Sequence, residues 1–297
     1  MTRADGRSVC LRTRGLRLHV RVYGPLDAPL LFLLHGWLDA SASFAPLIAA
    51  LRAETGDPLC VIAPDQRGFG YSQGAGATYW FPDYIADLDA VVNHFAADRD
   101  VLMAGHSMGA QVASLYAGLR PHRVQRLALL DGLAVPDMPA ATAPRRYAAW
   151  LDPLGTPAVA RSYPDFTALE ARIAAHHPGF GPHQAGLLAH AWAAPDGNGR
   201  VRLLADPTHR RDGPLVYHSA DAETVWRCVT APTLFLLAGK SPFRESLGRA
   251  EYARRMACFA KHEDCVLEGV GHLMHVEAPR RCAAILAKFF RGARLCG

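Results

Sequence analysis

The feature that most constrains the fold is a serine between two glycines, where an apolar run meets an amphipathic helical pattern. Residues 101–119 read VLMAGHSMGAQVASLYAGL, with Gly105 two positions before Ser107 and Gly109 two positions after it. The plainest interpretation is a turn whose serine caps the helix. This interpretation does not account for the two glycines. Glycines at these positions remove the Cβ atoms that would collide in a very sharp turn. The stretch therefore predicts a strained strand-to-helix turn that projects the Ser107 hydroxyl above the edge of a sheet as a nucleophile.

Short apolar runs alternate with helical patterns over most of the chain. Such runs are typical of strands that are buried on both faces of a parallel sheet. We therefore predict an α/β fold, a doubly wound and mostly parallel sheet with helices on both sides. Residues 16–24 alternate between apolar and polar side chains and are predicted to form an antiparallel edge strand. The predicted buried strands lie within residues 28–36, 58–65, 101–107, 126–132, 232–239 and 264–272, and the clearest further helices within 83–96 and 282–290.

One long segment breaks this alternation. It has few strand signals and several helical patterns, and structureless connections of such length are rare in compact domains. We predict that residues 134–230 form a helical cap. The cap is inserted into an α/β core made of residues 1–133 and 231–297.

Composition and charge argue against several classes of protein. The 297 residues have a formal net charge of +5, but the basic residues are scattered, which argues against a nucleic-acid partner and leaves a modest preference for anionic ligands open. The seven cysteines are odd in number and form no Cys-x-x-Cys pair, so neither a disulfide framework nor a metal site is expected. No signal peptide is evident, and no apolar run approaches the ~18 residues of a membrane span. We expect a cytoplasmic protein with no membrane association, and the sequence carries no signal of its oligomeric state.

A serine hydroxyl is too weak an acid to attack unaided, so a base must lie within its hydrogen-bonding reach. His272, in a glycine-containing loop after the last apolar run, is the best candidate. His275, at the start of the final helical pattern, is its competitor and is more typical of a structural histidine. Negative charge that develops on a substrate carbonyl needs preorganised N–H donors. The candidates are the backbone N–H groups of Met108, directly after the serine, and of Trp37, in the loop after the first buried run.

Four short motifs are spread along the chain. They are LHGW at residues 34–37, DQRGFGYS at 65–72, GHSMGA at 105–110 and GVGHLMHVEAP at 269–279. In their order and spacing the chain resembles the α/β-hydrolase superfamily over nearly its whole length, and residues 35–51 resemble its serine-hydrolase-like proteins. By this resemblance Ser107 corresponds to the nucleophile, His272 to the base, and Trp37 and Met108 to the oxyanion donors. No cofactor is expected.

The acid that would orient the base departs from the commonest pattern of that superfamily. Many members carry an aspartate in the turn after the strand that follows the cap, but Pro242 stands there in this chain and only Glu245 is near it. Some members, including certain haloalkane dehalogenases and cofactor-free dioxygenases, carry the acid after the strand that precedes the cap. Asp131 stands there, and functional groups gather at the carboxyl ends of parallel strands. Asp131 is therefore the predicted partner of His272; Glu245 is the alternative, and a turn-capping role is the plain interpretation of Asp131.

Three classes of function are compatible with these residues. The leading one is a serine hydrolase that cleaves a carboxylic ester, thioester or related carbonyl bond through an acyl-enzyme. The second is a cofactor-independent dioxygenase of a heteroaromatic substrate, and the third is a non-catalytic ligand-binding receptor. Epoxide and haloalkane hydrolysis are disfavoured, because those members carry an aspartate where Ser107 stands. His35, Trp150 and Trp192 are candidates for binding an apolar or aromatic part of a small-molecule substrate, although aromatic side chains also pack caps onto cores.

Overall fold

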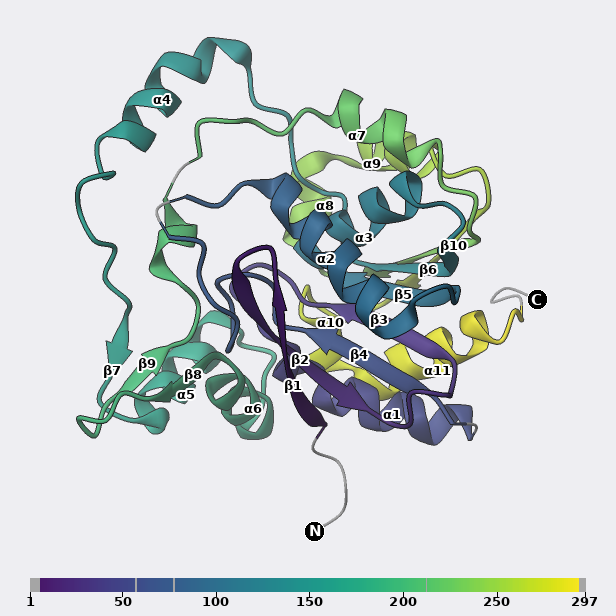
Figure 1. Cartoon of the computed structure of the whole chain (residues 1–297), viewed down its shortest axis with the longest axis horizontal. Coiled ribbons are helices and arrows are strands. Elements are labelled where there is room, and N and C mark those ends of the chain that lie inside the picture. The colour runs from purple at the N-terminus through teal and green to yellow at the C-terminus, as the bar shows by residue number, and fades with distance from the viewer. Residues whose placement is uncertain (1–5, 57, 77, 212, 294–297) are drawn as a thin grey trace.

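The computed structural model describes residues 6–293 except 57, 77 and 212, and an eight-stranded sheet forms its centre (Figure 1). The strands are β1 (Arg7–Thr13), β2 (Leu16–Tyr23), β3 (Leu30–Leu34), β4 (Cys60–Pro64), β5 (Val101–His106), β6 (Val124–Leu130), β10 (Thr233–Ala238) and β11 (His262–Leu267). Their order across the sheet is β1-β2-β4-β3-β5-β6-β10-β11. The pairs β1/β2 and β2/β4 are antiparallel, and the other neighbours are parallel. The predicted mostly parallel sheet is confirmed.

Helices cover both faces of this sheet. They are α1 (Ala45–Thr55) after the 3₁₀ helix η1 (Ser41–Phe44), α2 (Phe81–Ala96), α3 (Met108–Leu119), α7 (Ser219–Trp226), α8 (Pro242–Leu247), α9 (Arg249–Met256), α10 (Met274–Glu277) and α11 (Pro279–Phe290). On one face, apolar side chains of α1 and α11 such as Leu47 and Leu286 form a single cluster with the strands. On the other face, α2, α3, α7 and α9 do the same with side chains such as Val91 and Tyr116. Two separate apolar layers therefore enclose the sheet, as a doubly wound fold requires.

The edge of the sheet differs from the prediction. Residues 16–24 contain the antiparallel strand β2, but β2 is not at the edge, because β1 pairs along its whole length from Arg7↔Val22 to Thr13↔Leu16. The sequence of β1, RSVCLRT, has few apolar residues, and its side chains are only half-buried or exposed. A strand of this kind has neither a continuous apolar run nor a clear alternation of apolar side chains, so the sequence does not predict it.

The insertion between β6 and β10 contains more than helices. Its elements are η2 (Ala140–Thr142), α4 (Ala143–Leu151), β7 (Ser162–Tyr163), α5 (Phe166–His176), α6 (Pro182–Trp192), β8 (Ala193–Pro195), β9 (Val201–Leu203) and η3 (Pro207–Arg210). Besides the helices of the predicted cap, strands β7, β9 and β8 form a small antiparallel sheet that the sequence does not predict. These strands have only two or three residues each, too few to show a period of two in the sequence.

The last helix of the predicted cap packs on the core. Trp226 of α7 is fully buried, and its indole Nε1 donates a hydrogen bond to the Ser114 hydroxyl of α3 at 2.9 Å. We therefore propose that the boundary between cap and core lies before α7 rather than at residue 230.

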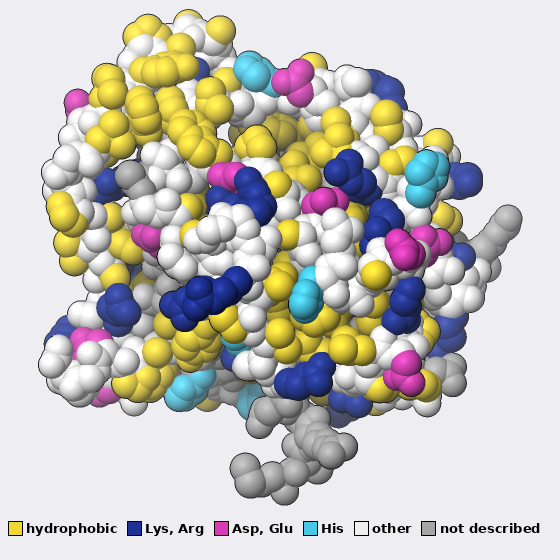
Figure 2. Space-filling model, viewed as in Figure 1, with side chains coloured by type: hydrophobic (Ala, Val, Ile, Leu, Met, Phe, Trp, Pro, Cys, Tyr) yellow, Lys and Arg dark blue, Asp and Glu magenta, His cyan; other side chains and the backbone are white. Residues whose placement is uncertain are grey.

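Helix α4 stands apart from the sheet, at the upper left of Figure 1. Figure 2 shows hydrophobic side chains gathered over this part of the molecule, and Tyr147 and Leu151 are among the exposed ones. The Arg146 side chain donates a hydrogen bond to the carbonyl of Pro214 at 2.6 Å. Helix α4 is therefore hydrogen-bonded to the segment through which the chain returns from the cap to the core.

The sequence predicts neither disulfides nor membrane-spanning helices. In the described part of the chain, Cys10, Cys60, Cys228, Cys258 and Cys282 have free thiols, and Cys296 lies outside the described residues. Among the helices that the structure describes, none has the length and apolar character needed to cross a membrane.

Candidate active site

Ser107 occupies a strained turn between β5 and α3. Its backbone angles are φ 53° and ψ −115°, a combination that residues with a side chain rarely adopt. A Cβ atom at Gly105 would collide with the carbonyl of Gly109, and one at Gly109 with the carbonyl of Leu34. The Ser107 N–H donates to the Leu130 carbonyl at 2.9 Å, which ties the turn to β6. The glycines thus permit the sharp turn, and the half-buried serine lies in the wall of a cavity.

His272 and Asp131 are in contact although they are far apart in the sequence. Oδ2 of Asp131 is 2.7 Å from Nδ1 of His272. Oδ1 of Asp131 accepts a hydrogen bond from the Ala238 N–H at 3.2 Å, so β10 orients the carboxylate. Asp131 is only 4% exposed and has a positive φ of 46° at the end of β6. This arrangement keeps a proton on Nδ1 of the imidazole and leaves Nε2 able to accept one.

Glu245, the alternative acid, and His275, the competing base, lie apart from this contact. Glu245 is exposed in the first turn of α8. From the same helix the ring of Phe243, not a carboxylate, packs on His272, with ring centroids 4.5 Å apart. His275 is fully buried and does not border the cavity. Of the two histidines, His272 is therefore the one that a bound substrate can reach.

The two residues predicted to bind an oxyanion are both next to the serine, one along the chain and one in space. Met108 is the first residue of α3, where backbone N–H groups have no acceptor within the helix. Trp37 follows Gly36, and a Cβ atom at Gly36 would lie 3.2 Å from the Cβ of Ser107. The lack of a side chain at Gly36 thus lets the loop after β3 approach the serine closely.

His106, directly before the serine, supports the loop that carries His272. Its Nε2 donates to the backbone carbonyl of His272 at 2.8 Å, and the two imidazole rings have centroids 4.6 Å apart. Burial lowers the pKa of His106 well below its usual range, and the nearby His275 and His272 lower it further. His106 is therefore neutral at pH 7, with its proton on Nε2. The sequence does not reveal this role, because the position before the serine has no required residue type in the Gly-x-Ser-x-Gly pattern.

A buried carboxylate, Asp39, joins the loop after β3 to the cap. Its Oδ1 accepts a hydrogen bond from Nε1 of Trp192 at 2.7 Å, and its Oδ2 accepts one from the Ser43 hydroxyl at 2.8 Å. Nε2 of His275 lies 3.4 Å from the same Oδ2. Burial alone would raise the pKa of Asp39, but hydrogen bonding and positive charge from His275 hold it well below its usual range. Asp39 is absent from the sequence prediction, although an aspartate in the loop after a buried strand is a usable signal.

These residues also include a set that could hold a metal ion. Asp39, His106 and His275 have possible ligand atoms within 4.8 Å of one another, and all three side chains are buried. Both oxygens of Asp39 already accept hydrogen bonds, whereas Nδ1 of His106 and Nδ1 of His275 have no hydrogen-bond partner.

The three side chains predicted to bind substrate have different surroundings. The prediction for His35 was wrong: the ring is fully buried, its Nδ1 is 2.8 Å from the Gly36 carbonyl oxygen and its Nε2 accepts from the Gln66 N–H at 2.9 Å. Both ring nitrogens are thus bound inside the core. Trp150 borders a smaller cavity of about 200 Å³ beside the two predicted oxyanion residues. Trp192 borders the same large cavity as Ser107.

This large cavity, of about 1540 Å³, lies between the cap and the core. Ser107 and His272 border it from the core. Its walls combine apolar and basic side chains. The apolar ones include Leu169, Ile173, Phe180, Leu203 and Phe243, and the basic ones are Arg161, Arg172, Arg210, Lys240, Arg280 and Arg281 together with several histidines. A ligand of the size of a typical small-molecule substrate can therefore reach both Ser107 and His272.

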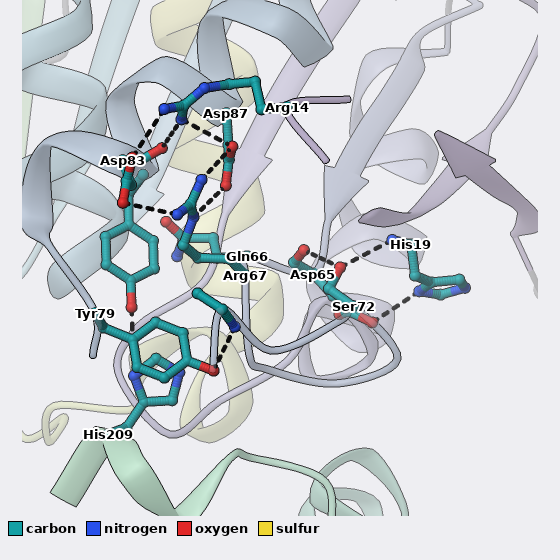
Figure 3. Close-up of polar contacts among 12 residues, drawn as sticks. Arg14, His19, Asp65, Gln66, Arg67, Ser72, Tyr79, Asp83, Asp87 and His209 are labelled. Carbon is teal, nitrogen blue, oxygen red and sulfur yellow. Dashed lines mark hydrogen bonds and ion pairs between the residues drawn. The ribbon is translucent and has the colours of Figure 1, made fainter. Parts of the chain in front are cut away.

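The DQRGFGYS motif forms the loop after β4, and Figure 3 shows the polar contacts of its residues Asp65, Arg67 and Ser72. Arg67 is paired with Asp83 at 2.8 Å and with Asp87 at 2.6 Å, both from α2. The Tyr79 hydroxyl, farther along, donates to Oδ2 of Asp206 in the cap at 2.7 Å. None of residues 65–72 borders the large cavity, so this motif connects α2 to the cap rather than contacting a ligand there.

His209 completes this connection between cap and core. Its ring stacks on Phe69 with centroids 3.9 Å apart and lies against Tyr79 at 3.7 Å. Burial lowers the pKa of His209 to about 4. The imidazole is therefore neutral at pH 7, and its protonation at acidic pH would oppose this packing.

Comparisons with known proteins show the family and the fold of the chain. The model of the alpha/beta hydrolase fold family matches residues 29–279. A serine hydrolase-like protein of Danio rerio is 35% identical over 116 residues, which are 38% of this chain and 34% of that protein, so the match spans about a third of the relative's length. The 2-(acetamidomethylene)succinate hydrolase of Mesorhizobium japonicum is 27% identical over 80% of each chain. The solved thioesterase domain from the curacin biosynthetic pathway superposes with a TM-score of 0.81 at 22% identity, covering 95% of this chain and 98% of that one, and shows the fold.

Proposed function

Because this chain belongs to the α/β hydrolase fold family, we propose that it is a serine hydrolase that cleaves a carboxylic ester, thioester or related carbonyl bond. In this proposal Ser107 is the nucleophile, His272 the general base and Asp131 the acid that orients it. The observation that carries the proposal is the 2.7 Å contact between Oδ2 of Asp131 and Nδ1 of His272, beside a strained serine in the wall of the same cavity. The hydrolase and thioesterase names of the similar proteins agree with this class of reaction.

The first half of the reaction forms an acyl-enzyme. The Ser107 oxygen attacks the substrate carbonyl carbon while Nε2 of His272 takes the hydroxyl proton. The carbonyl oxygen becomes an oxyanion, which the N–H groups of Met108 and Trp37 stabilise. The tetrahedral intermediate collapses as the bond to the leaving alcohol or thiol breaks, and the imidazolium returns its proton to that leaving group.

The second half releases the acid and restores the serine. Water enters the space left by the alcohol or thiol, and Nε2 of His272 takes one of its protons as the water oxygen attacks the acyl carbon. The second tetrahedral intermediate then breaks its bond to the Ser107 oxygen, which recovers the proton from the imidazolium. The products are a carboxylic acid and the free enzyme, and no redox partner is consumed.

The residues behind this set support the proposed roles of the reacting groups. Oδ2 of Asp131 faces Nδ1 of His272 because the Ala238 N–H binds the other carboxylate oxygen. His106 anchors the His272 loop through its carbonyl and stays neutral because of its burial, so it does not place a second positive charge beside the imidazolium that forms during the reaction.

The proposal is tested by labelling and by turnover. A fluorophosphonate should modify the wild-type protein at Ser107, and p-nitrophenyl esters of increasing acyl length should be hydrolysed. Ser107→Ala should abolish both without unfolding the protein, since the hydroxyl carries the covalent chemistry. Ser246→Ala, at an exposed serine on α8, is the matched control and should retain both activities. Ester turnover retained by Ser107→Ala would eliminate the proposal, and oxygen consumption by that variant with a heteroaromatic substrate would favour the dioxygenase.

A further inference from the structure

We propose that three arginines of the cap, Arg161, Arg172 and Arg210, form an anion-recognition subsite. In this view, which rests on the proposed function, the substrate is an ester or thioester that carries a carboxylate or phosphate group away from the scissile carbonyl. The three arginines come from different parts of the cap: Arg161 precedes β7, Arg172 lies on α5 and Arg210 ends η3. All three border the cavity that contains Ser107 and His272. The fold of the cap therefore gathers three positive charges at the candidate site.

These arginines are not neutralised by a nearby acidic side chain in the part of the chain that the structure describes. Among the described residues, none of the three guanidinium groups forms an ion pair with a carboxylate. Some arginines elsewhere in the described part of the chain do form ion pairs, as Arg67 does with Asp87 at 2.6 Å and Arg254 with Glu251 at 2.7 Å. The three side chains are also close enough to affect one another: burial lowers the pKa of Arg210, and the charges of Arg161 and Arg172 lower it further. Like charges held together in this way are stabilised when an anion binds between them.

The carboxylates in the cavity wall are already engaged. Asp39 accepts hydrogen bonds from Trp192 and Ser43, and Glu277 accepts one from the Gly271 N–H at 2.7 Å. On the opposite wall the cavity gains further positive charge from Lys240, Arg280 and Arg281. A bound anion would therefore meet arginine and lysine side chains without displacing an existing ion pair.

Arg210 connects the subsite to the reaction centre. Its guanidinium carbon lies 5.9 Å from the centroid of the Trp37 ring, and half of the Trp37 side chain is exposed. A guanidinium over an indole face is held by a cation–π interaction and still presents its N–H donors to a ligand. Because the backbone N–H of Trp37 is a proposed oxyanion donor, Arg210 connects the subsite to the residue that would bind the carbonyl oxygen. Apolar side chains such as Leu169 and Ile173 border the same cavity and suit an aliphatic segment between the two polar ends of the substrate.

The test compares isosteric esters with and without a charge. The probes are mono-p-nitrophenyl glutarate, p-nitrophenyl 4-phosphonobutyrate and the neutral p-nitrophenyl 5-oxohexanoate. The wild type should show a kcat/KM for at least one anionic probe that is about tenfold or more above the neutral one. The triple variant Arg161→Gln, Arg172→Gln, Arg210→Gln should reduce that ratio by about 10- to 100-fold, and the preferred anionic probe distinguishes carboxylate from phosphate. Arg145→Gln is the control, because Arg145 is an exposed cap arginine that does not border the cavity.

The outcomes separate this proposal from the proposed function. A ratio near one in the wild type, or an unchanged ratio in the triple variant, would overturn the subsite while fluorophosphonate labelling of Ser107 left the hydrolase assignment standing. If no ester is hydrolysed and Ser107 is not labelled, the proposed function fails, and calorimetric titration with glutarate and with inorganic phosphate then decides the subsite. At least tenfold weaker binding by the triple variant than by the wild type supports it. Equal binding of both anions by the two proteins overturns it.

Discussion

Replacing Asp131 with asparagine tests the proposed hydrogen-bond geometry most directly. In the structure Oδ1 of Asp131 accepts the Ala238 N–H at 3.2 Å, while Oδ2 faces Nδ1 of His272 at 2.7 Å. An asparagine in the same position keeps its carbonyl oxygen toward Ala238, because only that atom can accept the backbone N–H. Its amide group then donates toward Nδ1. The imidazole has to respond by carrying its proton on Nε2, where it can no longer take the proton of Ser107.

The expected loss follows from this change of tautomer. A misplaced imidazole proton lowers kcat by about 10⁴-fold in serine proteases, which corresponds to about 5.5 kcal/mol of transition-state stabilisation. We expect the same order for Asp131→Asn in hydrolysis of a p-nitrophenyl ester. The melting temperature should fall only slightly, because asparagine has nearly the shape of aspartate and retains the bond to Ala238.

The control is Glu245→Gln, which removes the carboxylate that stands nearest to the usual acid position of the superfamily. Glu245 is exposed on α8, so its substitution should leave kcat nearly unchanged. A loss of less than tenfold in Asp131→Asn would refute the reasoning, and so would a Glu245→Gln variant as impaired as Asp131→Asn. In either case the roles proposed for Ser107 and His272 would need to be reconsidered together with that of the acid.

Three further substitutions test the surroundings of the site. His106→Ala should lower kcat by roughly tenfold with a smaller change in KM, because the His272 carbonyl loses its donor and the loop loses its register; steady-state kinetics over a range of pH check this, and an unchanged kcat would contradict it. Gly109→Ala should reduce the free energy of unfolding in urea by at least about 2 kcal/mol, since the new Cβ meets the backbone of β3, and wild-type stability would show that the turn is not under this constraint. The pKa of His209 is lowered to about 4 in the folded protein, so as pH falls from 6.5 toward 4 the unfolded chain binds a proton that the folded chain does not. The free energy of unfolding should therefore drop by up to about 3 kcal/mol over this range. Urea unfolding at several pH values should show a shallower loss in His209→Phe, and identical pH dependence in both proteins would rule out this contribution.

The sheet and the serine turn could be predicted because their signals are local. A run such as Leu30–Leu34 is apolar at every position, as expected of a strand buried on both faces, and the glycines beside Ser107 report a backbone collision that arises within a few residues. Strand β1 has no such signal, because its half-exposed side chains carry no clear period. The cap strands are too short to show a clear period, which explains why the sequence does not predict them.

The residues of the site are predictable only where local sequence patterns or the edge of the parallel sheet define their positions. Asp131 could be paired with His272 because both follow strands of one sheet, and the carboxyl ends of parallel strands meet at one edge. Asp39 and Trp192 form their hydrogen bond only because the cap folds over the core. The sequence around each residue carries no signal that predicts the other as its partner. The same holds for Arg210 over Trp37. Contacts between the cap and the core depend on how two distant parts of the chain pack against each other, and local sequence patterns carry no signal of that packing.

The unusual position of the acid has a consequence for the substrate. An aspartate in the turn after β10 would have brought a carboxylate toward the imidazole from the wall that Lys240 and Phe243 now occupy. With Asp131 as the partner of His272, the negative charge comes instead from the end of β6, where it is 4% exposed and is bound by Ala238 on its other oxygen. The wall after β10 is left with a cation and an aromatic ring. On the two proposals made above, an anionic substrate would approach Ser107 past positive and apolar groups, while the Asp131 carboxylate that would orient His272 is buried against the imidazole.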